Sequence, residues 1–195
     1  MTSVFDPAYA AGVPPWDIGR PQPEFVRLAE AGEIRGDVLD VGCGTGENAM
    51  HLAGLGHRVW GVDSSPVAIE KAKAKTVRRG SKATFRAFDA LELHRLGRKF
   101  DTIIDSGLFH GFSDEGRELF TSNLAAALRS RGTYHMLCFS EHEPDSWGGP
   151  RRVTQAEIRF TFREGWRINY IREAEFETNI HPAGGRAWLS SITRP

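Results

Sequence analysis

The amino-acid sequence predicts an α/β fold in which a mostly parallel sheet carries helices on both faces. Short β-rich runs alternate with helical patterns along most of the chain, which is typical of parallel strands joined by crossover helices. Two strand-like runs then follow each other directly, and this order places one antiparallel strand near the edge of the sheet. With 195 residues, 40% of them hydrophobic, the chain suffices for one core and is short for two, so we expect one domain over residues 1–195.

Seven stretches have the composition of strands. Five belong to the alternating part of the chain, at residues 37–42, 58–63, 84–89, 100–106 and 133–140. Two more, at 166–178 and 185–194, flank the segment "NIHPAGG", whose proline and glycines suit a hairpin turn. The sequence therefore predicts a seven-stranded sheet.

The expected helices carry recognisable start and stop signals. The segment 64–80 has Ser65 as a cap, Pro66 at its start and Gly80 at its end. Thr154 and Glu157 form a capping box that predicts a helix over about 155–163. Two further helices are expected at 22–32 and 113–132, and the second of these has a core-facing stripe made of Phe120, Leu124, Ala127 and Leu128.

Composition excludes several classes of protein. Lys plus Arg and Asp plus Glu both total 25, so no net field attracts nucleic acid, and the basic run at 71–82 is expected to be a solvated helix face. Because no stretch resembles a signal peptide or a membrane span, we expect a soluble, cytoplasmic protein. The two cysteines, Cys43 and Cys138, lack the spacing of a disulfide framework or a metal site, and no metal is expected.

The stretch "VLDVGCGTGEN", residues 38–48, is a glycine loop at the end of the first strand. Gly42, Gly44 and Gly46 form G-x-G-x-G, whereas a dinucleotide-binding fingerprint requires a glycine where this chain has Glu47. An acidic side chain at a phosphate site repels the ligand, but a positively charged sulfonium has no such objection. A P-loop is excluded as well, because no Gly-Lys-Ser/Thr follows.

Aspartates stand at the carboxyl ends of four expected strands. They are Asp40, Asp63, Asp89 and Asp105. An open α/β sheet forms its ligand crevice at this edge, and Asp63 lies at the distance from the glycine loop at which an acidic residue reaches a ribose diol. Asp101 opens a strand instead of closing one and is expected to be a solvated turn residue.

These motifs resemble those of a known enzyme family. The segments "LDVGCGTG", "VWGVDSS", "AFDAL" and "FDTIIDSGLFH" are similar, in order and spacing, to class I S-adenosylmethionine-dependent methyltransferases, from about residue 36 to the end. The resemblance implies a Rossmann-like fold and S-adenosyl-L-methionine as cofactor. It also implies that the methionine part, the ribose, the adenine and the region of the amino group and sulfur are contacted by Asp40, Gly42, Cys43, Gly44, Gly46, Asp63, Ser64, Asp89, Ala90, Asp105 and Ser106.

Two segments have the composition of lids over the sheet. The segment "PWDIGRPQPEF", in the expected lid 1–22, resembles thiopurine S-methyltransferase-like and heterocyclic toxin methyltransferases, and this implies that Trp16 covers the cofactor and Arg20 lies at the pocket mouth. Trp16 is equally explained as a surface tryptophan that pins the N-terminus to the core. The second lid, 140–153, contains Trp147, which either stacks on a flat acceptor or packs on its own loop. Phe109 is a further candidate contact to the acceptor.

Two histidines are candidates for accepting the acceptor's proton. His110 follows the fourth expected strand and His142 follows the fifth, and a histidine of near-neutral pKa suits this task. Each is also explained as a hydrogen-bonded structural residue. The other five histidines lack a strand-end position. Most of the rate acceleration of methyl transfer is expected from alignment of the acceptor with the methyl group and from exclusion of water.

The expected function is methylation of N, O or S in a small aromatic heterocycle, in detoxification or secondary metabolism. The acceptor is expected to be small because "DSGLFH" stands where amino-methylating enzymes have an Asp/Asn-Pro-Pro-Tyr type segment, no nucleophilic cysteine follows, and no appended domain exists to grip a macromolecule. Alternatives are a tellurite or metalloid methyltransferase and a noncatalytic S-adenosylmethionine-binding protein. A nicotinamide oxidoreductase is disfavoured by Glu47. We expect a monomer or homodimer.

Overall fold

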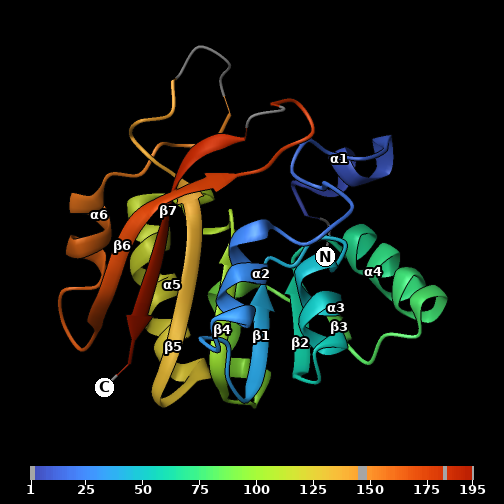
Figure 1. Ribbon diagram of the computed structural model, residues 1–195, viewed down its shortest axis with the longest axis horizontal. Coiled ribbons are helices and arrows are strands. Elements are labelled where there is room, and N and C mark those ends of the chain that lie inside the picture. The colour runs from blue at the N-terminus through green and yellow to red at the C-terminus, as the bar shows by residue number, and fades with distance from the viewer. Residues whose placement is uncertain (1–2, 145–148, 182–183, 195) are drawn as a thin grey trace.

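The computed structural model describes residues 3–144, 149–181 and 184–194, and its centre is a seven-stranded sheet (Figure 1). The strand order is β3-β2-β1-β4-β5-β7-β6. Only β7 runs antiparallel to its neighbours β5 and β6, and it lies one place in from the edge. The predicted mostly parallel sheet with one antiparallel strand near its edge is thus confirmed. The strands are β1 (Asp37–Val41), β2 (Arg58–Asp63), β3 (Thr84–Ala87), β4 (Phe100–Ser106), β5 (Leu128–Phe139), β6 (Arg167–Phe176) and β7 (Gly185–Thr193).

Helices cover both faces of the sheet, as predicted. One face packs against α2 (Pro23–Glu30), α3 (Glu47–Gly54) and α4 (Pro66–Arg79), and the other against η1 (Ala90–Leu96), α5 (Asp114–Ala127) and α6 (Gln155–Thr161). The remaining short helices are α1 (Asp6–Ala11) and η2 (Phe109–Gly111). Across the described residues, every helix is too short or too polar to span a bilayer.

The predicted helix caps form as the sequence indicates. The Ser65 hydroxyl accepts the backbone N–H of Ala68 at the start of α4, and Gly80 ends that helix with a φ of 63°. Thr154 and Glu157 form the reciprocal capping box at the start of α6. These local bonds satisfy backbone groups that a helix end otherwise leaves unpaired.

The boundary between α5 and β5 differs from the prediction. The helix expected over 113–132 ends at Ala127, and β5 begins at Leu128, which pairs with Phe100 of β4. The Arg129 guanidinium donates to the carboxylates of Asp101 at 2.6 Å and Asp37 at 3.1 Å, both at the starts of other strands. Long-range pairing therefore overrides the helical propensity of this basic segment.

Candidate functional site

The carboxyl ends of β1, β2 and β4 bring three of the predicted aspartates to one edge of the sheet. Asp40 lies in β1 opposite Gly61 of β2 and Ile104 of β4, while Asp63 and Asp105 lie at the ends of their strands. All three side chains are buried. The glycine loop follows β1 at the same edge, so the parallel topology alone assembles this group.

The glycine loop needs glycine at each of its three predicted positions. Gly42, Gly44 and Gly46 have φ of 70°, 52° and 88°, in the left-handed region where side chains are strained. A Cβ on Gly46 would lie 2.5 Å from the Phe85 ring, and one on Gly44 would lie 2.8 Å from the Tyr9 hydroxyl. Side chains therefore fill the space that a Cβ would need at Gly44 and Gly46, and only glycine fits there.

Asp63 ties the glycine loop to the turn after β2. Its two carboxylate oxygens accept the backbone N–H groups of Gly44 and Ser65, each at 2.8 Å. Burial raises the pKa of Asp63 above its usual value despite these bonds. Because each oxygen retains a second acceptor position, this carboxylate is able to bind a further hydroxyl.

Asp40 has the one buried carboxylate oxygen in this group that accepts no hydrogen bond from the described residues. Its Oδ2 accepts the backbone N–H of Ala49 at 3.1 Å, while Oδ1 has no partner. Burial, and then the nearby charges of Asp105 and Asp63, raise its pKa to about 8. An unpaired oxygen among carboxylates fits a cationic ligand, such as the ammonium or sulfonium of S-adenosylmethionine.

Asp105 is satisfied by the protein itself. Its oxygens accept the backbone N–H groups of Leu108 at 2.7 Å and Phe109 at 3.1 Å, and the Tyr134 hydroxyl at 2.6 Å. Burial raises its pKa to about 7. These bonds hold the turn after β4, where Ser106 is half-buried. The contacts of Asp105 thus fix the backbone around Ser106 and leave Asp40 as the open carboxylate.

The predicted adenine-side residues lie at the ends of β2 and β3. The Ser64 hydroxyl is 2.9 Å from that of Ser3, and the Asp89 carboxylate accepts the backbone N–H of Leu91 at 2.8 Å. Asp89 caps η1, whose first residue is the buried Ala90. The strand expected to end at Asp89 ends at Ala87, because the chain turns into η1 there.

His110 is buried in an aromatic stack. Its ring lies parallel to that of Phe139, with 5.1 Å between ring centroids, and its Nδ1 accepts the Phe139 backbone N–H at 3.2 Å. Burial, followed by the charges of Arg152 and Arg117, lowers its pKa to about 3. A neutral ring in this state carries its proton on Nε2, so these contacts suit a hydrogen-bond donor better than the general base that the sequence suggested.

Phe109 and Arg117 lie together beneath this turn. The Phe109 ring is fully buried in the core instead of facing solvent, because η2 turns it toward α5 and α6. The Arg117 guanidinium carbon lies 4.6 Å from the Phe109 ring centroid, and its Nη1 donates to Glu157 at 3.1 Å. Although Arg117 is only 3% exposed, its Nε and Nη2 have no partner among the described residues. No motif or periodicity in the sequence singles out this arginine.

His142 is exposed and borders a groove. Its ring lies edge-on to Trp188, and it lines a cavity of about 820 Å³. The predicted lid 140–153 is closed at its base, where Ser140 bridges to Val153. Trp147 lies outside the described residues. The other residues that line the groove are Glu24, Arg27, Ser140, Glu173, Ala174, Glu175, Arg186 and Ala187.

The N-terminal segment lies against the glycine loop and α4 (Figure 1). It contains the helix α1, which the sequence did not predict, and the Ser65 hydroxyl donates to Asp6 of that helix at 2.5 Å. Lys71 donates to the backbone oxygens of Tyr9 and Gly12. The Trp16 indole N–H donates to the Tyr9 hydroxyl at 2.9 Å, and Trp16 remains 42% exposed. This arrangement leaves an aromatic surface next to the loop.

The structure adds contacts to four predictions about charged residues. Glu47 is not a free charge at the start of α3, because Lys75 and Arg79 of α4 bind its carboxylate at 2.7 and 2.6 Å. The basic run of α4 therefore pairs with α3 and is not only a solvated helix face. Arg20 pairs with Glu177 at 2.9 Å. Asp101 is no free turn residue either, since it accepts the Asp37 backbone N–H at 2.8 Å.

Cys43 completes the predicted set of loop residues. Its backbone N–H donates to the Val62 oxygen at 3.0 Å, as that of Gly42 does at 2.8 Å. A Cβ on Gly61 would lie 2.9 Å from the Cys43 sulfur, so this side chain packs behind the loop. The small residue thus allows the loop to lie close to β2.

Comparisons with known proteins identify the family of this chain. Residues 38–132 match a family model described as a methyltransferase domain. The chain is 37% identical, over 89% of its length and 77% of the relative, to 2-heptyl-1-hydroxyquinolin-4(1H)-one methyltransferase of Mycobacteroides abscessus.

Two solved structures are similar as well. The first comes from work on the conversion of a disulfide bond into a thioacetal group during echinomycin biosynthesis; it has a TM-score of 0.90 and 38% identity, with coverage of 100% of this chain and 93% of that one. The second is magnesium protoporphyrin IX methyltransferase from Synechocystis with bound S-adenosylmethionine, with a TM-score of 0.67, 25% identity, and coverage of 89% and 77%. With the bare glycine loop and the open carboxylate of Asp40, these matches show that the chain belongs to the S-adenosylmethionine-dependent methyltransferases.

Proposed function

We propose that this protein transfers a methyl group from S-adenosylmethionine to a nitrogen, oxygen or sulfur atom of a small aromatic heterocycle, in detoxification or secondary metabolism. The observation that carries the cofactor assignment is the buried, unpaired Oδ1 of Asp40 beside two other carboxylates. The acceptor class is supported by the relative from M. abscessus, which acts on a hydroxyquinolinone.

The cofactor-binding residues follow from the shape and charge of the loop. S-adenosylmethionine supplies a methyl group on a positively charged sulfur that leaves as a neutral thioether. In our proposal Asp40 binds the cationic amino-acid end, and Asp63 binds the ribose hydroxyls. The open backbone of the glycine loop lies against the methionine part. The remaining contacts are assigned to Cys43, Ser64, Asp89, Ala90, Asp105 and Ser106.

In this proposal aromatic side chains position the acceptor. The proton of the acceptor passes to a group that is exposed to solvent. Trp16 lies over the loop through its bond to Tyr9 and covers the cofactor in this proposal. Arg20 at the mouth and Trp147 in the second lid contact the acceptor. Because His142 is exposed at the groove, it is the better placed proton acceptor. His110 stays neutral and orients the turn after β4.

The test begins with calorimetric binding of S-adenosylmethionine and of its demethylated product. The expected result is that Asp40→Asn loses about tenfold to a hundredfold in affinity, because a hydrogen bond to a charged group contributes about 1.5–3 kcal/mol. An equal loss for both ligands assigns Asp40 to the ammonium, and a larger loss for S-adenosylmethionine assigns it to the sulfonium. Asp114→Asn, an exposed aspartate on α5, is the matched control.

A methyl-transfer screen on the same samples then separates an enzyme from a noncatalytic binding protein. We expect turnover with at least one hydroxyquinoline, phenazine or related heterocycle. Unchanged affinity in Asp40→Asn contradicts the proposed cofactor site. Cofactor binding without turnover on any heterocycle contradicts the proposed acceptor class.

A sulfur acceptor is the second candidate. It is supported by the similarity over the whole chain to a structure from work in which a disulfide becomes a thioacetal. Thiols therefore belong in the same screen, and faster turnover on a thiol than on its oxygen or nitrogen counterpart identifies sulfur as the acceptor atom.

We further propose that the protein acts in the cytoplasm, as a monomer or homodimer and without a nucleic-acid partner. Free Cys43 and Cys138 are consistent with a reducing compartment. Equal numbers of acidic and basic residues give no net attraction to a polyanion. Light scattering of the purified chain measures its oligomeric state, and a binding assay with nucleic acid at moderate salt tests the absence of that partner.

A further inference from the structure

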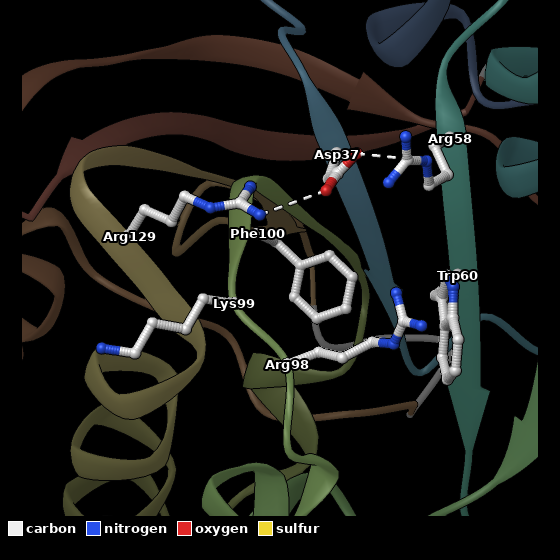
Figure 2. Close-up of a pocket in the computed structure, with 7 residues that line it drawn as sticks. All are labelled: Asp37, Arg58, Trp60, Arg98, Lys99, Phe100 and Arg129. Carbon is white, nitrogen blue, oxygen red and sulfur yellow. Dashed lines mark hydrogen bonds and ion pairs between the residues drawn. The ribbon is translucent and has the colours of Figure 1, made fainter.

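A second cavity lies at the amino ends of the strands, opposite the carboxyl ends that form the candidate active site. Its volume is about 220 Å³, and it is bordered by the first residues of three strands, Asp37 of β1, Arg58 of β2 and Phe100 of β4 (Figure 2). Trp60, Arg98, Lys99 and Arg129 complete the lining. Since the aspartates of the active site lie at the carboxyl ends of these strands, the two sites are separated by the length of a strand.

The cavity has more positive charge than its carboxylates offset. Asp37 is shared between Arg129, at 3.1 Å, and Arg58, at 3.6 Å. Asp101 binds the other terminal nitrogen of Arg129 at 2.6 Å. Arg98 and Lys99 have no carboxylate partner within the described ranges of the chain. With Asp37 and Asp101 offsetting two of the four cations, two positive charges remain.

Arg98 and Arg129 have partners that order them before any ligand arrives. The Arg98 guanidinium carbon lies 4.4 Å from the Trp60 ring centroid, a cation–π contact that favours one position of this group. Figure 2 shows Arg58 and Arg129 approaching Asp37 from two sides, while the Lys99 ammonium extends away from the other cations. Prior ordering lowers the entropic cost of binding for the arginines.

We propose that this cavity binds a phosphate dianion, either free phosphate or the phosphate group of a small metabolite. Guanidinium groups match phosphate oxygens through paired N–H donors, and Arg98 gives the cavity a cation that no carboxylate among the described residues offsets. The volume is below the range of about 300–1,000 Å³ typical of drug-sized ligand sites, which restricts the organic part to a small group. Trp60 and Phe100 offer that group an apolar wall.

Calorimetric titration of inorganic phosphate into the full chain tests the proposal. Ionic strength is kept constant with chloride, and the titration is repeated with saturating S-adenosylhomocysteine to occupy the active site. We expect binding that S-adenosylhomocysteine leaves unchanged, and a loss of about tenfold or more in Arg98→Gln. Absence of phosphate binding by the wild-type chain, or its abolition by S-adenosylhomocysteine, overturns the proposal.

Two matched variants separate contact from general charge. Lys99→Gln removes the same charge from the cavity lining, but its head group points away, so we expect less than about threefold loss from screening of a longer-range interaction. Arg95→Gln removes an exposed cation that is paired with Glu92 and should leave binding unchanged. Equal losses in all three variants overturn the proposal. All three positions are exposed, and urea unfolding of each variant establishes that it is folded.

Phenyl phosphate distinguishes the two sources of the anion. Tighter binding than inorganic phosphate, with the gain lost in Trp60→Leu, identifies a small metabolite that uses the apolar wall. Equal binding of the two ligands identifies free phosphate. A short single-stranded oligonucleotide that binds far more tightly than either, with a steep salt dependence, overturns the proposal in favour of a nucleic-acid surface.

Discussion

The charged side chains at the two ends of the strands differ in sign and in burial. At the carboxyl ends, Asp40, Asp63 and Asp105 are at most 8% exposed and have raised pKa values. At the amino ends, Arg98 and Arg58 are exposed around a cavity with few carboxylates. Burial of the carboxylates costs free energy in the absence of a ligand, whereas water solvates the arginines at the amino ends. Substitutions should therefore have large effects at the first end and small ones at the second.

The largest effect on stability is expected from Gly46→Ala in the glycine loop at the carboxyl ends of the strands. The alanine would have a φ of 88° and a Cβ only 2.5 Å from the Phe85 ring, so we expect a loss of about 2–5 kcal/mol in the free energy of unfolding. Gly54→Ala is the control, because that position has ordinary backbone geometry and open space, and it should gain up to about 1 kcal/mol. Urea unfolding measures both. Similar effects of the two substitutions would contradict the assigned strain.

The second prediction concerns the pH dependence of stability without ligand. Because the pKa of Asp40 rises to about 8 on folding from 3.8, the folded state holds a proton that the unfolded state releases. The stabilisation is complete below about pH 4 and is lost as the pH rises through about 8, with a slope of up to about 1.4 kcal/mol per pH unit. Asp40→Asn should flatten this slope.

Urea unfolding across this pH range provides the measurement. Asp105, whose pKa rises to about 7, leaves part of the slope in the variant. The exposed Asp114→Asn should keep the slope of the wild-type protein. A slope in Asp40→Asn that equals that of the wild type would show that Asp40 is ionised at neutral pH in the folded chain.

The third prediction separates the two histidines by the pH profile of methyl transfer. With a pKa lowered to about 3, His110 does not change its charge in the neutral range, so His110→Gln should keep every inflection of the wild-type profile there. His142→Gln should lower the rate of methyl transfer, because it removes the proposed proton acceptor. If His110→Gln removes an inflection of the wild-type profile instead, His110 is the base and its buried ring must open during the reaction.

The smallest effects are expected at the amino ends of the strands. Arg129→Ala should lower the free energy of unfolding by about 1 kcal/mol or less, because its ion pairs are partly exposed and solvent screens them. Arg98→Ala should change it by no more than about 0.5 kcal/mol. Methyl-transfer activity should be unchanged in both variants. A loss of several kcal/mol in Arg98→Ala would remove the contrast between the two ends.

The strand pattern of this chain was predictable because it depends on local composition. Period and punctuation placed all seven strands and the caps of α4 and α6, and parallel topology then brought Asp40, Asp63 and Asp105 together. The assignment of the family was equally accessible, since it rests on short motifs of fixed spacing.

Features that depend on distant contacts were not predictable in the same way. β5 starts at Leu128, which pairs with Phe100 of β4, and the adjacent Arg129 binds Asp37 and Asp101. Glu47 is neutralised by α4, a segment that starts many residues later. No periodicity distinguishes the unpaired Asp40 from the satisfied Asp105, because hydrogen-bond partners are set by tertiary geometry.

The order of synthesis gives the N-terminal segment a further consequence. Gln22 exchanges hydrogen bonds with the backbone of Glu177, 155 residues later, and the Asp17 oxygen accepts a bond from Asn179, 162 residues later. A ribosome must therefore complete nearly the whole chain before these bonds form. Until then, only contacts with the first half of the chain, such as those of α1 with Ser65 and Lys71, hold this segment, and its attachment is completed when the last strand pair is made.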